Sequence, residues 1–233
     1  MIHARPPSSL SLRILSSIVL IPLVIGVMYW GGWGYGVLLA ACIGVAVAEW
    51  MHLTVKITPK LWKRLALGII GIIYLELSFI EMAWLRLWLA DGFEWILFLF
   101  LTIWSSDTLA FIFGKNFKGP KMTPTISPNK TWSGYAGALL GPALTLSLCI
   151  HVLTPDSLIG HTPSLISTMI VGVAIGITGQ SGDLMISLMK RKAGVKDTGN
   201  LIPGHGGILD RIDALLLVLP VYCAYLIFIH PDF

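Results

Sequence analysis

The sequence predicts an all-α, polytopic integral membrane protein, and composition, apolar segments and charge distribution all indicate this fold class. Of the 233 residues, 55% are hydrophobic and only 12% are charged, and the mean hydropathy is +0.81. A soluble domain of this length does not need so many apolar residues. The chain is therefore expected to be embedded in a lipid bilayer.

Seven apolar segments are candidates for transmembrane helices, because about 20 residues suffice to cross the hydrocarbon core. They lie near residues 14–30, 34–50, 65–80, 94–112, 134–153, 165–185 and 214–230. The longest polar stretch, roughly residues 187–213, is too short for a separate soluble domain. We therefore expect one integral-membrane domain over residues 1–233, with N-terminal helices in residues 1–100 and the catalytic part in residues 101–233.

Positive charges gather on one predicted side of the membrane. Of the 16 Lys and Arg residues, 15 lie before the first segment or after the second, fourth and sixth, and only Arg86 lies elsewhere. The positive-inside rule assigns these regions to the cytoplasm, which predicts an N-in, C-out topology with an odd number of spans. Basic loops at that face meet anionic lipid, so the net charge of +4 requires no nucleic-acid partner.

Small residues inside the segments have predicted structural roles. Cys42, Cys149 and Cys223 lie in apolar segments without a CxxC spacing, so neither a disulfide nor a zinc site is expected. GxxxG spacings at residues 137–141 and 172–176 favour close helix packing over ligand contact.

Two polar stretches interrupt the apolar pattern before the sixth segment. WSSDTLAFIFGK places Asp107 in a membrane helix, where it either pairs with a Lys or Arg or joins Ser105, Ser106 and Thr108 in a hydrated pocket. ISPNKTWSG, residues 126–134, offers polar groups just before the fifth segment, at Ser127, Asn129, Lys130 and Thr131. Backbone amides at a helix start, with a Lys beside them, are suited to bind an anion.

A third stretch, residues 182–213, is the most informative. If the sixth segment stays helical to its end, Asp183, Ser187 and Lys190 share one face. Asp210 and Asp213 are three residues apart at the start of the seventh segment and project together if helical, with Arg211 turned away.

Asp183, Asp210 and Asp213 supply the oxygen ligands that Mg²⁺ takes alongside substrate phosphates. The alternative for these acids is a set of salt bridges to Lys190, Arg191 and Arg211.

The PGHGG turn, residues 203–207, lies between these acids. Its glycines, Gly206 and Gly207 among them, permit backbone conformations that let phosphate approach the amides. His205 is either a ligand contact or a structural hydrogen-bonding residue of the turn. It is a poor zinc candidate, since no partner His or Cys lies nearby in the sequence.

The run from Ser187 to Asp213, with KR, KD, PGHGG and DRxD at these spacings, resembles the signature of the phosphatidate cytidylyltransferases, the bacterial CDP-diacylglycerol synthases. The resemblance extends to GDL at 182–184, SPNKTW at 127–132 and SDT at 106–108, and so to most of the chain after residue 100. It implies a multi-pass, homodimeric enzyme of the cell inner membrane that transfers CMP from CTP to phosphatidic acid and releases pyrophosphate. It also implies a Mg²⁺ cofactor, with K⁺ beside it, and an active site at the cytoplasmic side.

Carried over by position, the resemblance implies metal-binding roles for Asp183, Asp210 and Asp213, which with Lys190 form the expected catalytic set. The residues implied to bind substrate are Lys130, Thr131, Ser187, Arg191, Lys196, His205, Gly206, Gly207 and Arg211. The chain departs from the family pattern at Ser133, where relatives often have an acid, and at Ala214, where they have a serine. The chain is also short for the family before residue 100.

The residues are consistent with such a reaction. A phosphate monoester oxygen is already ionised near neutral pH, so no strong general base is needed, and positioning and charge neutralisation should dominate.

Two other function classes use similar residues. A transporter predicts acids near mid-membrane in two related halves, whereas these acids cluster at one face without an internal repeat. A kinase or cytidylyltransferase acting on another membrane lipid is the nearer alternative, although the sequence has no GxxxxGK[ST] motif.

Overall fold

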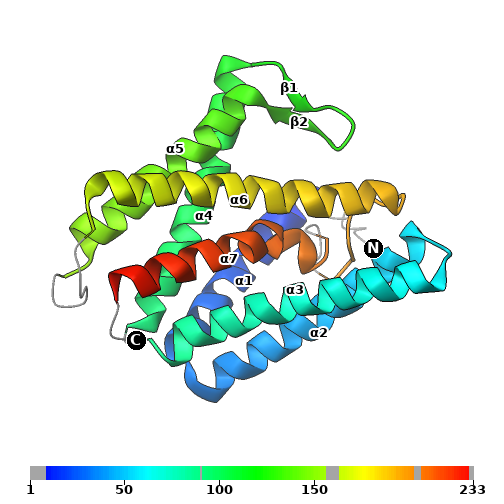
Figure 1. Ribbon diagram of the computed structural model, residues 1–233, viewed down its shortest axis with the longest axis horizontal. Helices are drawn as coiled ribbons and strands as arrows, with labels where there is room; N and C mark the ends of the chain where they lie inside the picture. The colour runs from blue at the N-terminus through cyan, green and yellow to red at the C-terminus, as the bar shows by residue number, and fades with distance from the viewer. Residues whose placement is uncertain (1–8, 90, 156–162, 202–205, 231–233) are drawn as a thin grey trace, which may run out of the picture.

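The computed structural model describes residues 9–89, 91–155, 163–201 and 206–230, and within them the chain is almost wholly helical (Figure 1). The helices are α1 (Ser9–Trp30), α2 (Gly32–Ile57), α3 (Leu61–Leu87), α4 (Gly92–Phe117), α5 (Trp132–Leu148), α6 (Leu165–Lys192) and α7 (Leu209–Ile229). A π-helical turn, Cys149–Leu153, extends α5. An antiparallel hairpin of β1 (Lys121–Thr123) and β2 (Ser127–Thr131) joins α4 to α5.

Six of these helices, α2 to α7, are long and apolar enough to cross a membrane, and in α1 the residues Ile18–Trp30 form a shorter apolar helix. The predicted all-α, multi-span fold is therefore confirmed. Several helices extend beyond the apolar segments seen in the sequence: α6, for example, continues through polar residues to Lys192. The hairpin was not predicted, because its strands are too short and polar to show an alternating pattern.

Consecutive helices pack against one another from α4 to α7, while α2 and α3 form an antiparallel pair that contacts α7 through α3. In Figure 1, α6 and α7 lie side by side, and the α2–α3 pair runs along the other side of α7. The GxxxG glycines mark the closest contacts. A Cβ atom on Gly137 or Gly141 would overlap backbone carbonyl groups of α4, and one on Gly172 or Gly176 would overlap backbone atoms of α5. Close helix packing explains these glycines, as predicted.

Most of the described Lys and Arg residues lie at the ends of α2, α4 and α6, in the connections that follow them or in the first turns of α3 and α7, and we call this side of the bundle the basic end. Arg86 lies at the opposite end, in the last turn of α3. Its guanidinium donates to the carbonyl oxygens of Met28 (2.5 Å) and Tyr29 (2.9 Å), near the last turn of α1. Unpaired carbonyls at a helix C-terminus favour a cation. The three cysteines are free thiols, of which Cys149 and Cys223 are buried.

Candidate functional site

Three carboxylates from three helices come together toward the basic end of the bundle. Asp213 of α7 interacts electrostatically with Asp183 of α6 and Asp107 of α4. The closeness of α6 and α7 here depends on Gly182, because a Cβ atom on this residue would overlap the carbonyl oxygen of Asp213. We call Asp107, Asp183 and Asp213 the acidic cluster. Carboxylates held near each other repel, unless a cation lies beside them or one of them is protonated.

Lys130 supplies one such cation. It lies at the end of β2, and its Nζ is 2.7 Å from Asp183 Oδ2 and 2.8 Å from Gln180 Oε1. The other oxygen of Asp183, Oδ1, accepts a hydrogen bond from Ser187 Oγ (3.2 Å). The hairpin is also held to α6 by Arg191, whose Nε donates to the carbonyl oxygen of Ile126 (3.1 Å).

The structure therefore brings together Lys130, Asp183 and Ser187, which the sequence placed in two separate stretches. The Asp183 side chain keeps 34% of its surface exposed, so it remains open to a ligand. An ammonium has three protons, and Asp183 and Gln180 engage two of those on Lys130. Among the described residues none engages the third proton, which can therefore donate to an anionic ligand.

Asp210 lies in a different environment, although it is one helical turn from Asp213. Its Oδ1 is 2.6 Å from Lys190 Nζ. Its Oδ2 lies within hydrogen-bonding distance of Thr198 N (2.8 Å), Thr198 Oγ1 (2.9 Å) and Gly207 N (3.0 Å). Only 5% of its side chain is exposed. Oδ1 of Asp210 is thus committed to α6 and Oδ2 to the connection between α6 and α7.

Glu49 of α2 also reaches this connection, and the sequence analysis missed it. Its carboxylate accepts hydrogen bonds from Ile208 N (3.0 Å), Leu209 N (2.9 Å) and Thr198 Oγ1 (2.8 Å). The residue is 8% exposed. The sequence did mark Glu49 as a candidate, because it is a carboxylate at the end of an apolar segment. A carboxylate within an apolar segment is also what singled out Asp107.

Thr131 and Ser133 form local hydrogen bonds at the start of α5. Thr131 accepts from Gly134 N (3.1 Å) and caps α5, so its hydroxyl serves the start of that helix. Ser133, at a family-variant position, accepts from Gly119 N (3.1 Å).

Gly206 has a positive φ of 84°, a conformation that glycine adopts without strain. The side chains of Arg191, Lys196 and Arg211 are exposed. His205 lies outside the described residues.

Arg211 interacts electrostatically with Asp107 of α4, which the sequence did not indicate. That Arg211 turns away from Asp210 and Asp213 stays a prediction. Another group that the sequence did not reveal is Tyr74 of α3. Its hydroxyl is buried without a hydrogen-bond partner among the described residues, and it interacts electrostatically with Asp213.

The chemistry of these donors fits a hard divalent cation. Within the described residues, no three His, Cys, Asp or Glu side chains converge closely enough to hold a metal by themselves. Mg²⁺ commonly takes only one or two carboxylates, however, and completes its coordination with water and substrate phosphate. Asp183 and Asp213 provide such a pair. Asp210 would have to give up an existing hydrogen bond to join them.

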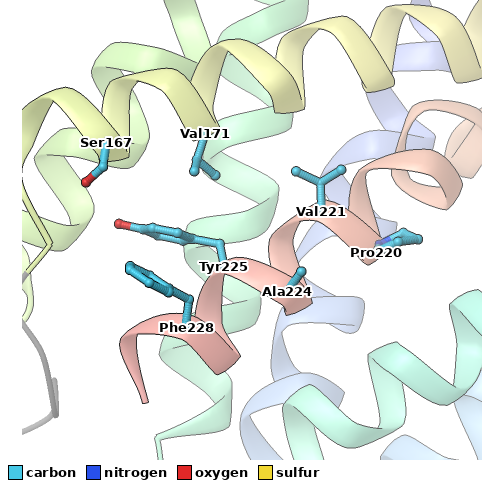
Figure 2. Close-up of a pocket in the computed structure, with 7 residues that line it drawn as sticks. All are labelled: Ser167, Val171, Pro220, Val221, Ala224, Tyr225 and Phe228. Carbon is cyan, nitrogen blue, oxygen red and sulfur yellow. The ribbon is translucent and has the colours of Figure 1, made fainter. Parts of the chain in front are cut away.

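One cavity lies away from this site. An apolar groove of about 520 Å³ lies between α6 and α7, lined by Ser167, Val171, Tyr225 and neighbours (Figure 2). Ser167 is 16 residues before Asp183 on α6, which corresponds to about 24 Å along the helix axis. A second cavity, of about 10 Å³, touches the acidic cluster and is lined by Ser106, Asp107, Gln180 and Ala214 among others. Its volume is about that of one water molecule.

Comparison with known proteins gives the site its chemical context. A model of the cytidylyltransferase family matches residues 54–229. The chain is 37% identical over 220 residues to a phosphatidate cytidylyltransferase of Rickettsia felis, a match that covers 94% of this chain and 92% of the relative. It is 36% identical to the corresponding protein of Rickettsia bellii, over 93% of this chain and 90% of the relative.

A phosphatidate cytidylyltransferase of Brucella melitensis is 35% identical over 198 residues, which cover 84% of this chain but 67% of that relative. The chain is therefore short beside the Brucella protein, as the sequence predicted, and matches most of the length of the Rickettsia proteins.

Proposed function

The chain belongs to the cytidylyltransferase family, and we propose that the acidic cluster, with Lys130, is the place where its two substrates react. The reaction is the transfer of CMP from CTP to phosphatidic acid, which gives CDP-diacylglycerol and pyrophosphate in phospholipid biosynthesis. The observation that carries the proposed site is the Lys130–Asp183 ion pair. It joins the SPNKTW and GDL stretches, far apart in the sequence, beside Asp107 and Asp213.

The bond changes follow from the reaction. A phosphate oxygen of phosphatidate attacks the α-phosphorus of CTP, and the bond between that phosphorus and the oxygen bridging to the β-phosphorus breaks. Pyrophosphate leaves with the electron pair of that bond. The attacking oxygen is already ionised near neutral pH, so the protein's main task is to hold two polyanions together. Lys130 and Lys190 offset their repulsion, and Ser187 orients Asp183.

We propose that Mg²⁺ is the cofactor, held by Asp183 and Asp213 together with phosphate oxygens of CTP. When bound, it neutralises charge on the phosphates and on the leaving pyrophosphate. The partial exposure of Asp183 supports this assignment, as does the electrostatic proximity of Asp213. Asp210 belongs to the same centre through Lys190 and shapes the adjacent connection. K⁺ beside Mg²⁺ is proposed from the family resemblance alone.

The substrates also account for a site at the end of a membrane bundle. The acyl chains of phosphatidate remain in the bilayer while its headgroup reaches Lys130, and CTP arrives from water, so neither substrate crosses the membrane. We propose that the basic end faces the cytoplasm, that the membrane is the cell inner membrane, and that the pocket opens laterally toward its inner leaflet. The charge bias supports this orientation. Homodimerisation is proposed from the resemblance, and the mass of the detergent-solubilised protein tests it.

The direct test is transfer of labelled CMP from CTP to phosphatidate by the purified protein, with and without a chelator. Labelled CDP-diacylglycerol that disappears with EDTA and returns with added Mg²⁺ supports both the reaction and the cofactor. Product formation unaffected by EDTA would overturn the metal proposal while leaving the reaction in place.

A further inference from the structure

Glu49 is a buried carboxylate that the reaction described above does not use. We propose that it is a positioning residue for CTP: it fixes the described parts of the connection between α6 and α7, residues 193–201 and 206–208, in the shape that receives the triphosphate. The inference rests on the proposed site, because Lys190 and Asp210 flank this connection. Glu49 also lies before residue 54, where the family match begins.

The contacts of Glu49 are those of a helix cap supplied by another helix. The residue at the N-cap position of α7 is Ile208, whose side chain forms no capping hydrogen bond. The amides of Ile208 and Leu209 donate instead to the two oxygens of Glu49, at 3.0 and 2.9 Å. A carboxylate at a helix N-terminus is stabilised by these amides and by the helix dipole. Glu49 therefore fixes the point at which α7 begins.

Thr198 transmits this anchoring to the centre of the connection. Its Oγ1 lies 2.8 Å from Glu49 Oε2 and 2.9 Å from Asp210 Oδ2. The hydroxyl has one proton, so at any moment it donates to one carboxylate and only contacts the other. Thr198 N donates to Asp210 as well (2.8 Å). One threonine, 3% exposed, thus joins α2, the α6–α7 connection and the first turn of α7.

Two glycines show that the connection is built around the Glu49 carboxylate. A Cβ atom on Gly199 would lie 2.6 Å from Glu49 Oε1. A Cβ atom on Gly207 would overlap both carboxylate oxygens of Glu49 and the Thr198 hydroxyl. Neither glycine has a positive φ, so a side chain at these positions would be tolerated by the backbone but would displace the hydrogen-bonded Glu49 carboxylate. Gly207 is therefore explained by Glu49 without any ligand contact.

The charges at and beside this connection favour the soluble substrate. Arg191 and Lys192 in the last turn of α6, and Lys196 in the connection, are exposed. Exposed cations at the aqueous end of the bundle are suited to a polyanion that arrives from water, and CTP is that substrate. The phosphatidate headgroup is reached from the bilayer, on the side of Lys130. Loosening the connection should therefore weaken CTP binding and leave phosphatidate binding nearly unchanged.

The test compares Glu49→Gln with Glu94→Gln, the same substitution at an exposed glutamate in the first turn of α4. Glutamine keeps the size of the side chain. Its NH₂ group is a donor, however, and it replaces one of the two oxygens that accept from the amides of Ile208 and Leu209. We expect the KM for CTP to rise at least about tenfold in Glu49→Gln, because a hydrogen bond to a charged group is lost. The KM for phosphatidate should change little, and Glu94→Gln should match the wild type in both.

A second pair of variants leaves the buried charge of Glu49 unchanged. Thr198→Val removes the hydroxyl at nearly constant volume, and Thr198→Ser retains it. The valine variant should show the same selective rise in the KM for CTP, and the serine variant should keep the wild-type KM for CTP. Equal increases in both KM values, or a loss of kcat alone in Glu49→Gln and Thr198→Val, would overturn the positioning role.

Amide hydrogen exchange of the full-length protein in detergent provides a readout that does not depend on activity. In Glu49→Gln the amides of Thr198, Ile208 and Leu209 should exchange faster, while those in the middle of α7 remain protected. Unchanged exchange at these three amides would contradict the anchoring itself. Faster exchange, combined with full activity in Asp183→Asn, would instead retain the anchoring and refute the proposed site.

Discussion

The backbone of Gly182 lies against the carbonyl group of Asp213, so closely that a Cβ atom on residue 182 would overlap the Asp213 oxygen. This contact sets the separation of α6 and α7 at the level where Asp183 and Asp213 emerge. The two carboxylates are thus held near each other by packing, despite their mutual repulsion. The absence of a side chain at residue 182 is part of how the fold assembles the site.

Gly182→Ala should separate these helices. We expect a loss of stability of about 1–3 kcal/mol, as for other overpacked interiors, and a fall in CMP transfer of at least about tenfold because near-attack geometry is sensitive to such displacements. Thermal unfolding and turnover in detergent measure the two effects. Gly44→Ala is the control, because a Cβ atom there meets nothing within 4 Å. Normal activity in Gly182→Ala would show that this contact does not define the site.

Lys130→Met should remove the cation that neutralises Asp183. We expect kcat/KM to fall about 100-fold, comparable with the loss of one preorganised donor in other active sites. Lys121→Met, an exposed lysine of the same hairpin, should remain close to wild type. If both variants lost activity equally, the effect would come from the hairpin's overall charge and not from the ion pair.

The two aspartates of α7 should respond differently to Mg²⁺. Asp213→Asn should raise the Mg²⁺ concentration needed for half-maximal activity, since it removes a proposed ligand. Asp210→Asn should lower activity at every Mg²⁺ concentration, because its oxygens hold Lys190, Thr198 and Gly207. A Mg²⁺ titration of each variant separates the roles. The same shift in both titrations would assign Asp210 to the metal as well.

The predicted topology can be tested with single cysteines in a variant whose native cysteines are replaced by alanine. Lys60→Cys lies in the α2–α3 connection at the basic end, and Asp91→Cys precedes α4 at the opposite end. A membrane-impermeant thiol reagent applied to intact cells should label the Asp91→Cys protein but not the Lys60→Cys protein. The reverse pattern would invert the orientation and place the site outside the cytoplasm.

The sequence was sufficient to predict the helices, because apolar length and charge bias report directly on the bilayer. It also indicated Asp183 and Ser187, since helical spacing alone puts them on one face. The same spacing grouped Asp210 with Asp213, but it carried no information on what each would contact. Asp210 faces the α6–α7 connection, and Asp213 interacts with residues of α6 and α4.

Glu49 shows more clearly which contacts cannot be predicted from the sequence. It lies in α2, far along the chain from Thr198 and Leu209, and only tertiary packing brings its carboxylate to their amides. Asp107 was singled out as a lone intramembrane carboxylate but left with two alternative roles. Its proximity to Asp183, Asp213 and Arg211 follows from the packing of α4, through α5, into the same bundle as α6 and α7.

We propose that CMP transfer takes place at the acidic cluster, and Asp183→Asn tests this most directly. Labelled CMP transfer to phosphatidate at saturating Mg²⁺ should fall at least about 100-fold in this variant, since a proposed metal ligand and the partner of Lys130 are lost together. Asp91→Asn is the control, because asparagine tolerates the left-handed conformation of residue 91, and it should retain full activity. An Asp183→Asn protein that transfers CMP at the wild-type rate would contradict the site proposed for this enzyme.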